Sequence, residues 1–156
     1  MLRILAILIA CAFPARAEFL WVEMLFGGME CASCSTFIQE KLSKNRNVQS
    51  VEMDNGKGLL KVTLKAGTRM RPEQIRDLVQ QSGFTPKETR ALARGTVTGQ
   101  AGKWTLTVPE PGQSYPLKAT GPLLDRLKES AGKSAEVEIV VSSGDCEVRG
   151  VRPAAL

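Results

Sequence analysis

The stretch of sequence that decides the fold is Glu18–Lys44, which reads EFLWVEMLFGGMECASCSTFIQEKLSK. Every second residue from Leu20 to Phe26 is apolar, and this alternation predicts a strand that buries one face. From Ser33 to Lys44 the apolar residues instead recur every four positions, with Phe37 beside them. That period predicts an amphipathic helix. The strand and the helix are therefore joined by a loop that contains two cysteines.

The chain that follows predicts four more elements. Two alternating runs within residues 48–64 are separated by turn-forming residues, which predicts a β-hairpin. A second helix is expected to begin at Pro72, because proline suits the first helical position, and to end at Gly83. Residues 84–92 predict a short, weak strand that Pro86 restricts to the edge of the sheet. The order βαββαβ is that of a ferredoxin-like α+β sandwich.

Residues 93–156 differ in their sequence pattern from residues 18–92. Short alternating runs punctuated by glycine and proline predict strands at 96–98, 104–108, 115–119, 137–141 and 148–151, and a helix at 122–132. This βββαββ order predicts a small β-barrel that resembles an OB-fold, with a core of its own. No flexible linker marks the boundary near Leu92, so the two expected domains, residues 18–92 and 93–156, adjoin directly.

Residues 1–17 are expected to be an export signal. Arg3 provides a positive end, Ile4–Phe13 is apolar, and Ala15–Ala17 has the small-x-small form of a cleavage site. The apolar run is shorter than the ~20 residues that a membrane span needs. The alternative is a lipoprotein signal at Cys11, but only ten residues precede that cysteine, which is short for such a signal. Either signal predicts a periplasmic or secreted protein.

The composition excludes several classes of function. The chain of 156 residues has no histidine, which excludes His-based acid–base catalysis, Ser-His-Asp and Cys-His nucleophiles, and metal sites that need imidazole. It also has no glycine-rich loop of the P-loop or dinucleotide-binding type. Loss of residues 1–17 lowers the net charge from +5 to +3, and neither half then carries more than +2. Nucleic acid is therefore not expected as a partner.

The remaining chemistry rests on cysteine. The mature chain keeps Cys31, Cys34 and Cys146, and an odd number of cysteines argues against a disulfide-stapled fold. Cys31 and Cys34 are three positions apart at the start of the expected helix, where two thiolates can converge on one soft cation and the helix N-terminus stabilises them. A redox site and a structural disulfide are the alternatives for this pair. Cys146 is expected to be a core thiol or a lone surface thiol.

The motif and its framing resemble a known family. GMxCxxC in the first loop of a βαββαβ unit is similar to the heavy-metal-associated domain, a family of copper chaperones, N-terminal modules of metal-transporting P-type ATPases and periplasmic mercury-binding proteins. Ile38 and Leu42 match its first helix, and Gly83–Phe84 matches its last loop. The resemblance covers about half of the mature chain. It implies that Cys31 and Cys34 hold one soft metal ion near the surface and pass it on by ligand exchange.

The residues around the motif bear on the identity of the metal. Two thiolates favour Cu(I), whereas the carboxylate of Glu30 adds a harder oxygen ligand that favours Zn(II) or Cd(II). In the resembling family, an acidic residue occupies this position in zinc- and cadmium-exporting ATPases. We expect Cu(I) ahead of Zn(II) or Cd(II), and ahead of Hg(II). Phe84 is expected to pack beside the metal loop and to shield it.

The sequence therefore predicts an exported heavy-metal-binding protein that is not an enzyme and has no catalytic residues. The expected partners are the metal ion and a membrane metal transporter or another metal carrier. A periplasmic thiol–disulfide oxidoreductase that uses Cys31 and Cys34 is the alternative function. Trp104 and Tyr115 are expected to lie in the core or in a surface patch, and not to stack on nucleic-acid bases.

Overall fold

The computed structural model describes residues 18–27, 32–109 and 112–154. Its elements in chain order are β1 (Glu18–Gly27), α1 (Ala32–Ser43), β2 (Val48–Asp54), β3 (Leu59–Leu64), α2 (Pro72–Gln81), β4 (Thr85–Gln100), β5 (Lys103–Val108), β6 (Gln113–Lys118), α3 (Pro122–Glu129), β7 (Ser134–Val140) and β8 (Cys146–Pro153). The predicted export signal, residues 1–17, lies outside the described residues. Among the described residues, no helix is long and apolar enough to cross a membrane.

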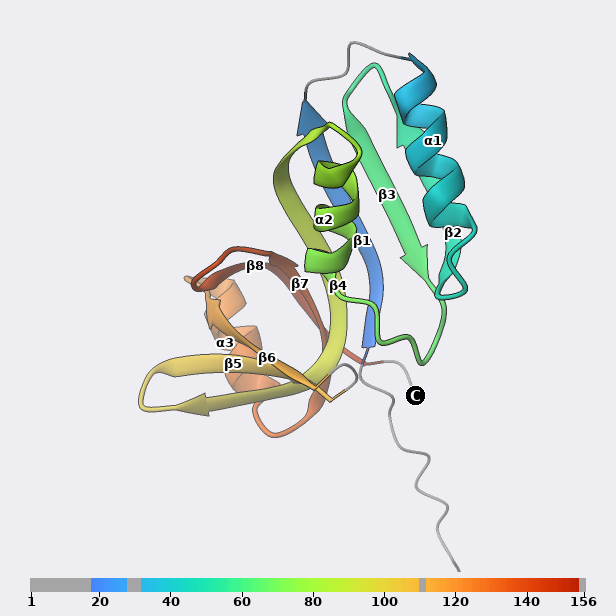
Figure 1. The fold of residues 1–156 in the computed structure, drawn as a ribbon. Coiled ribbons are helices and arrows are strands. Elements are labelled where there is room, and N and C mark those ends of the chain that lie inside the picture. The colour runs from blue at the N-terminus through green and yellow to red at the C-terminus, as the bar shows by residue number, and fades with distance from the viewer. Residues whose placement is uncertain (1–17, 28–31, 110–111, 155–156) are drawn as a thin grey trace, which may run out of the picture.

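The first six elements form a ferredoxin-like α+β sandwich, as predicted. Their strands follow the order β2-β3-β1-β4, and every neighbouring pair is antiparallel. Figure 1 shows α1 and α2 on the same face of this sheet. The buried residues Ile38 and Leu42 of α1 and Ile75 and Val79 of α2 pack in the core with the sheet. The periodicity of the two helices therefore identified their inner faces.

Two predicted side-chain orientations are wrong. In β1 the alternation holds for residues 22–26, but Phe19, and not Leu20, continues the buried face. The register against β4 shifts between Phe19 and Trp21, and such an irregularity moves the following side chains to the other face of the sheet. In α1, Phe37 lies outside the buried stripe and is 58% exposed.

Strand β4 differs most from the sequence-based expectation. The stretches 84–92 and 96–98, predicted as separate strands, form parts of one strand of 16 residues, and the expected boundary near Leu92 falls inside it. This strand is not weak, because β1 and β7 flank its middle and β5 pairs with its last residues. Pro86 lies in the first part of β4, where β1 is the only described strand that pairs with it, as its missing N–H requires.

Two glycines inside β4 explain why the sequence indicated a break there. A Cβ on Gly95 would lie 2.4 Å from the carbonyl oxygen of Thr107 in β5. The indole ring of Trp104 covers Gly99, where a Cβ would lie 2.5 Å from the ring. Both glycines therefore allow β5 to approach β4 closely, and they do not end the strand.

The second half of the chain closes into a five-stranded barrel. Its strands pair in the order β4-β5-β6-β8-β7, and the pairing of β7 with β4 closes the ring. All of these pairings are antiparallel except the short parallel pairing of Leu117 and Lys118 in β6 with Cys146 and Glu147 in β8. Helix α3, between β6 and β7, contributes the fully buried Leu127 to the core. With the end of β4 as the first strand, the order is the predicted βββαββ.

One hydrophobic core runs through the sandwich and the barrel. Phe19 at the start of β1 packs edge to face against Tyr115 of β6, with ring centroids 5.5 Å apart. The hydroxyl of Tyr115 donates to Oε1 of Gln113 at 3.0 Å and lies 3.4 Å from a carboxylate oxygen of Glu73 in α2. The two halves are therefore joined by side chains as well as by β4.

Candidate metal centre

The loop with the two cysteines joins β1 to α1. β1 ends at Gly27 and α1 begins at Ala32, and Figure 1 shows both at the same end of the sandwich. Cys34 belongs to the first turn of α1, although its side chain lies outside the described part of the structure. Residues 28–31, which include Cys31, lie outside it as well. The described residues around the loop define the surroundings of the predicted site.

The start of α1 suits negatively charged thiolates. A helix N-terminus presents backbone N–H groups without helical partners and the positive end of the helix dipole. The first turn of this 12-residue helix contains no acidic residue, so no carboxylate of the helix competes for that end. A thiolate in this turn, to which Cys34 belongs, is stabilised by both effects.

A hydrogen bond connects the first turn of α1 to the turn between β2 and β3. Asn55 donates from Nδ2 to Oγ of the buried Ser35 at 3.2 Å. Ser35 directly follows Cys34 in the sequence, so this bond fixes the backbone that carries the second cysteine of the motif. The sequence predicted the turn, but no local pattern indicates a contact between residues 20 positions apart.

The same turn packs against the end of β1. Phe26 donates its backbone N–H to the carbonyl oxygen of Gly58 at 2.8 Å. Gly58 has a φ of 60°, and a Cβ there would lie 2.5 Å from the carbonyl oxygen of Phe26. Glycine meets both requirements, since it has no Cβ and tolerates a positive φ. Gly58 therefore holds the end of β1 just before the cysteine loop.

Phe84 packs at the same end of the sheet. Helix α2 ends at Gln81 with Ser82 as its C-cap, and Gly83 follows with a φ of 90°. As predicted, this left-handed glycine stops the helix, and it turns the chain back toward the sheet. Phe84 then packs edge to face on Phe26, with ring centroids 5.3 Å apart and both rings buried. Its predicted contact with the metal loop itself involves residues outside the described ranges.

Lys87 is a residue that the sequence analysis did not single out. Its side chain lies over Gly27, because a Cβ on Gly27 would lie 2.9 Å from Cε and 3.2 Å from Nζ of Lys87. The pairing of Gly27 with Thr85 brings this part of β4 beside the end of β1. Lys87 thus adds a positive charge next to the last described residue before the cysteine loop. No motif marks it among the 21 lysines and arginines of the chain.

Cys146 lies elsewhere, in the barrel. It is a free, fully buried cysteine in β8, opposite Leu117 of β6, and burial raises the pKa of its thiol. The expectation of a core thiol is therefore confirmed. Within the described residues, no group of three or more cysteine, aspartate or glutamate side chains gathers in a way that could hold a metal ion.

The two barrel aromatics do not form an open stacking platform. Tyr115 is only 6% exposed, and burial, with the nearby carboxylate of Glu73, raises the pKa of its phenol. Trp104 is partly buried against the core and covers Gly99. These positions agree with the predicted role of both rings in packing.

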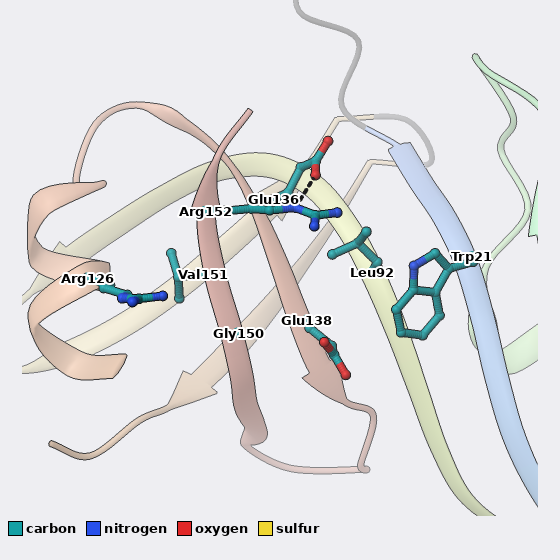
Figure 2. Close-up of a pocket in the computed structure, with 8 residues that line it drawn as sticks. All are labelled: Trp21, Leu92, Arg126, Glu136, Glu138, Gly150, Val151 and Arg152. Atoms are coloured by element: carbon teal, nitrogen blue, oxygen red, sulfur yellow. Dashed lines mark hydrogen bonds and ion pairs between the residues drawn. The ribbon is translucent and has the colours of Figure 1, made fainter. Parts of the chain in front are cut away.

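A separate hollow lies where the sandwich sheet meets the barrel, and it has a volume of about 280 Å³. Figure 2 shows Trp21 and Leu92 on one side of it, Arg126 and Val151 on the other, and Gly150 between them. Gly150 has no side chain to fill this space, and a Cβ there would make only ordinary van der Waals contacts, the nearest with Glu138. It is not adjacent in sequence to either cysteine of the motif.

An ion-pair network borders this hollow. The buried carboxylate of Glu136 accepts hydrogen bonds from Nη2 of Arg94 at 2.8 Å and from Nε of Arg152 at 2.6 Å. Arg94 also lies 3.5 Å from the buried carboxylate of Glu18. Burial acts to raise the pKa of Glu136, but the two arginines outweigh it and hold the pKa below its ordinary value. These charges therefore join β1, β4, β7 and β8.

Comparisons with known proteins identify part of the chain. Residues 25–85 match the model of the heavy-metal-associated domain, which confirms the resemblance for that part and supports a role in binding or handling metal ions. A solved structure described as "Crosstalk between Cu(I) and Zn(II) homeostasis" is similar at 22% identity, over 43% of this chain and 94% of that chain, with a TM-score of 0.38. No curated protein sequence matches the chain significantly.

Proposed function

We propose that this protein, whose residues 25–85 form a heavy-metal-associated domain, is an exported metal-binding protein and not an enzyme. Cys31 and Cys34 hold one soft metal ion between them and release it by ligand exchange, for transfer or sequestration. The observation that carries this proposal is the position of the CxxC pair, between β1 and α1 of the family-matched unit and with Cys34 in the first helical turn. A thiolate pair at a helix start suits a soft cation.

The charges at this end of the sandwich support the same conclusion. Two thiolates that bind a monovalent ion leave a net negative charge, which a nearby positive group stabilises. The N-terminus of α1 supplies a partial positive charge, and the ammonium group of Lys87 lies beside Gly27. Compensating positive charge therefore lies near the loop on α1, which follows it, and on β4, which pairs with the end of β1.

Cu(I) is the proposed metal, ahead of Zn(II), Cd(II) and Hg(II). Two sulfur ligands three residues apart suit a soft ion with low coordination number. Glu30, which lies outside the described residues, adds a carboxylate next to the pair. Oxygen ligands increase the affinity for Zn(II) and Cd(II), so Glu30 is proposed to reduce, without reversing, the preference for Cu(I).

The setting proposed for this exchange lies outside the cytoplasm. Residues 1–17 have the charge and apolar pattern of an export signal that is cleaved after Ala17. This pattern favours a cleaved signal over a lipoprotein signal with lipidation at Cys11. The proposed partner is a membrane metal transporter or another metal carrier that accepts the ion through its own thiolates.

The barrel is proposed to be OB-like. The ring order β4-β5-β6-β8-β7, with a helix between its third and fourth strands in sequence and a short parallel closure, supports this assignment. OB-folds are five-stranded, partly open Greek-key barrels. Since β4 belongs to both units, the barrel is proposed to hold the metal-binding unit in a fixed orientation.

The test is a metal titration of the reduced mature chain against a competing chelator. We expect about one Cu(I) per chain, because two deprotonated cysteines form one site. Cys31→Ala and Cys34→Ala should each lose most of the affinity. Cys146→Ala is the matched control and should keep the wild-type stoichiometry, since Cys146 is buried in the barrel. Equal binding by all four proteins would contradict the assignment.

A second assay separates the carrier from the oxidoreductase. A thiol–disulfide oxidoreductase exchanges its CxxC pair with disulfide substrates in the absence of metal. We expect no catalytic turnover of a disulfide substrate by the metal-free protein. Metal-free turnover that requires both Cys31 and Cys34, without tight metal binding, would favour the oxidoreductase.

A further inference from the structure

The sandwich sheet has one face covered by α1 and α2 and one face over which no described helix lies (Figure 1). Directly paired residues on neighbouring strands point to the same face. On the uncovered face one row crosses all four strands, from β2 through β3 and β1 to β4. Its members, in spatial order, are Glu52, Lys61, Glu23 and Arg90.

The signs of these side chains alternate across the sheet: negative, positive, negative, positive. Neither Glu23 nor Glu52 has a cation within ion-pair distance among the described residues. Lys61 instead places Nζ 5.7 Å from the ring centroid of Trp21, and Arg90 pairs with Glu88 at 2.7 Å. Glu23 therefore attracts its neighbour Arg90 only at longer range, and neither carboxylate of the row is held in a close ion pair by a described residue.

We propose that this uncovered face binds a second copy of the chain through a twofold axis that runs along the strands, between β1 and β3. Such an axis exchanges β1 with β3 and β2 with β4. It places Lys61 opposite the partner's Glu23, and Glu52 opposite the partner's Arg90. The row −+−+ changes sign when its order is reversed, so each charge meets its opposite in the symmetric dimer.

The apolar members of the neighbouring rows fit the same axis, and Asp54 and Glu88, which this axis brings toward each other, are each paired within their own chain, with Lys57 and Arg90. Leu25 pairs with Leu59 on adjacent strands, so the axis places Leu25 of one protomer opposite the partner's Leu59. Trp21 pairs with Thr63 and would face the partner's Thr63. Leu25, Leu59 and Trp21 are all partly exposed, and the dimer would cover them.

The topology also selects this axis over the alternative. A twofold axis across the strands would place every charge of the row against its own copy, which like-charge repulsion disfavours. With the proposed axis, the barrel beyond β4 comes beside β2 of the partner subunit. β2 is an edge strand of the sheet, so no further described strand of the partner occupies the place beside it.

The interface is small, since four strands span only about 15 Å between the outer two. Exposed ion pairs are individually weak and are screened by salt. The charges therefore set the register and the choice of partner more than the affinity. We expect a reversible dimer whose dissociation constant rises with salt concentration.

Sedimentation equilibrium of the metal-free, reduced chain without residues 1–17 tests this dimer. Lys61→Glu and Glu23→Lys each place two like-charge contacts in the homodimer, and each should raise its dissociation constant by about tenfold or more. An equimolar mixture of the two variants restores both attractive contacts, so it should form a heterodimer. Lys103→Glu, the same charge change at an exposed site in the barrel, is the matched control and should dimerise like the wild type.

Circular dichroism of each variant establishes that it folds. Glu52→Lys mixed with Arg90→Glu provides a second complementary pair, which serves if Lys61→Glu or Glu23→Lys does not fold. Recovery of association on mixing either pair supports the proposal. A wild-type chain that stays monomeric at its highest soluble concentration overturns it. A dimer whose dissociation constant does not change with the substitutions also overturns it. The same holds for a mixture that associates no more tightly than each variant alone.

Discussion

The sandwich and the barrel share a strand, yet Cys34 and Cys146 hold different positions in the fold. Cys34 lies in the first turn of α1, at the end of the sheet where Gly27 and Lys87 also lie. Cys146 is fully buried between β6 and β8, and burial raises the pKa of its thiol. The difference teaches that the position in the fold, and not the residue type, decides which cysteine is suited to bind metal.

The two halves also differ in how local their stabilising contacts are. The helices of the sandwich show their buried faces through local periodicity. The barrel depends on distant partners, since β4 pairs with β1 on one edge and with β7 on the other, and Phe19 packs on Tyr115. The barrel is therefore expected to be more sensitive to where the chain is cut.

The largest effect is expected when β4 is cut. A fragment of residues 93–156 loses the pairing of Arg90–Leu92 with β7. We expect this fragment to give a random-coil circular dichroism spectrum, contrary to the independent core that the sequence suggested. A fragment that begins at Thr85 keeps all of β4 and should give a β-rich spectrum. Equal folding of both fragments would show that the barrel does not need the first part of β4.

The next effect concerns the network that joins the two halves. Glu136→Gln breaks two ion pairs of a buried carboxylate, and we expect a loss of about 3 kcal/mol in the free energy of unfolding at neutral pH. The folded pKa of Glu136 is lowered from its ordinary value of 4.5. Its stabilisation is therefore present above pH 4.5 and is lost as the pH falls through the folded pKa.

Urea unfolding of both proteins at neutral and acidic pH measures this difference. The stability gap between wild type and Glu136→Gln should shrink in acid, because the carboxylate of the wild type becomes protonated. A gap that is the same at both pH values would show that the charge of Glu136 does not stabilise the junction.

A smaller effect is expected at the turn that holds the end of β1. Gly58→Ala combines a φ of 60° with a Cβ 2.5 Å from the carbonyl oxygen of Phe26. We expect it to lower the free energy of unfolding by about 2 kcal/mol. Gly102→Ala is the matched control, because its φ is 79° but no atom lies within 4 Å of the added Cβ. It should cost only about 1 kcal/mol. Thermal unfolding that ranks the two variants in the opposite order would contradict this account of Gly58.

The smallest effect concerns metal selectivity. Glu30→Thr removes the carboxylate next to the cysteine pair, and we expect the affinity for Zn(II) or Cd(II) to fall by about tenfold while that for Cu(I) changes little. Chelator competition with each metal measures both constants. Equal changes for both classes of metal, or no change for either, would show that Glu30 does not set selectivity.

The features that the sequence predicted are those with a local signal. The four-residue period identified Ile38 and Leu42 as buried, and the proline and glycine signals at Pro72 and Gly83 located both ends of α2. The GMxCxxC motif pointed to the unit that the family comparison then matched. Each of these depends on residues close together in the chain.

The features that the sequence missed depend on distant contacts. Gly95 indicated a break, yet it lies inside β4 because the carbonyl oxygen of Thr107 approaches it. The bond between Ser35 and Asn55, and the position of Lys87 over Gly27, follow from the strand pairing that brings these segments together. No pattern within one segment contains that information.

Mass-spectrometric mapping of cysteine alkylation tests the central claim most directly, because it reports each thiol of the native protein separately. In the reduced apo protein, Cys31 and Cys34 should react quickly, while Cys146 should react only after unfolding, since it is fully buried. One equivalent of Cu(I) should protect Cys31 and Cys34 together and leave Cys146 unchanged. Equally fast labelling of Cys31 and Cys34 with and without Cu(I) would contradict the assignment of the metal site to this pair.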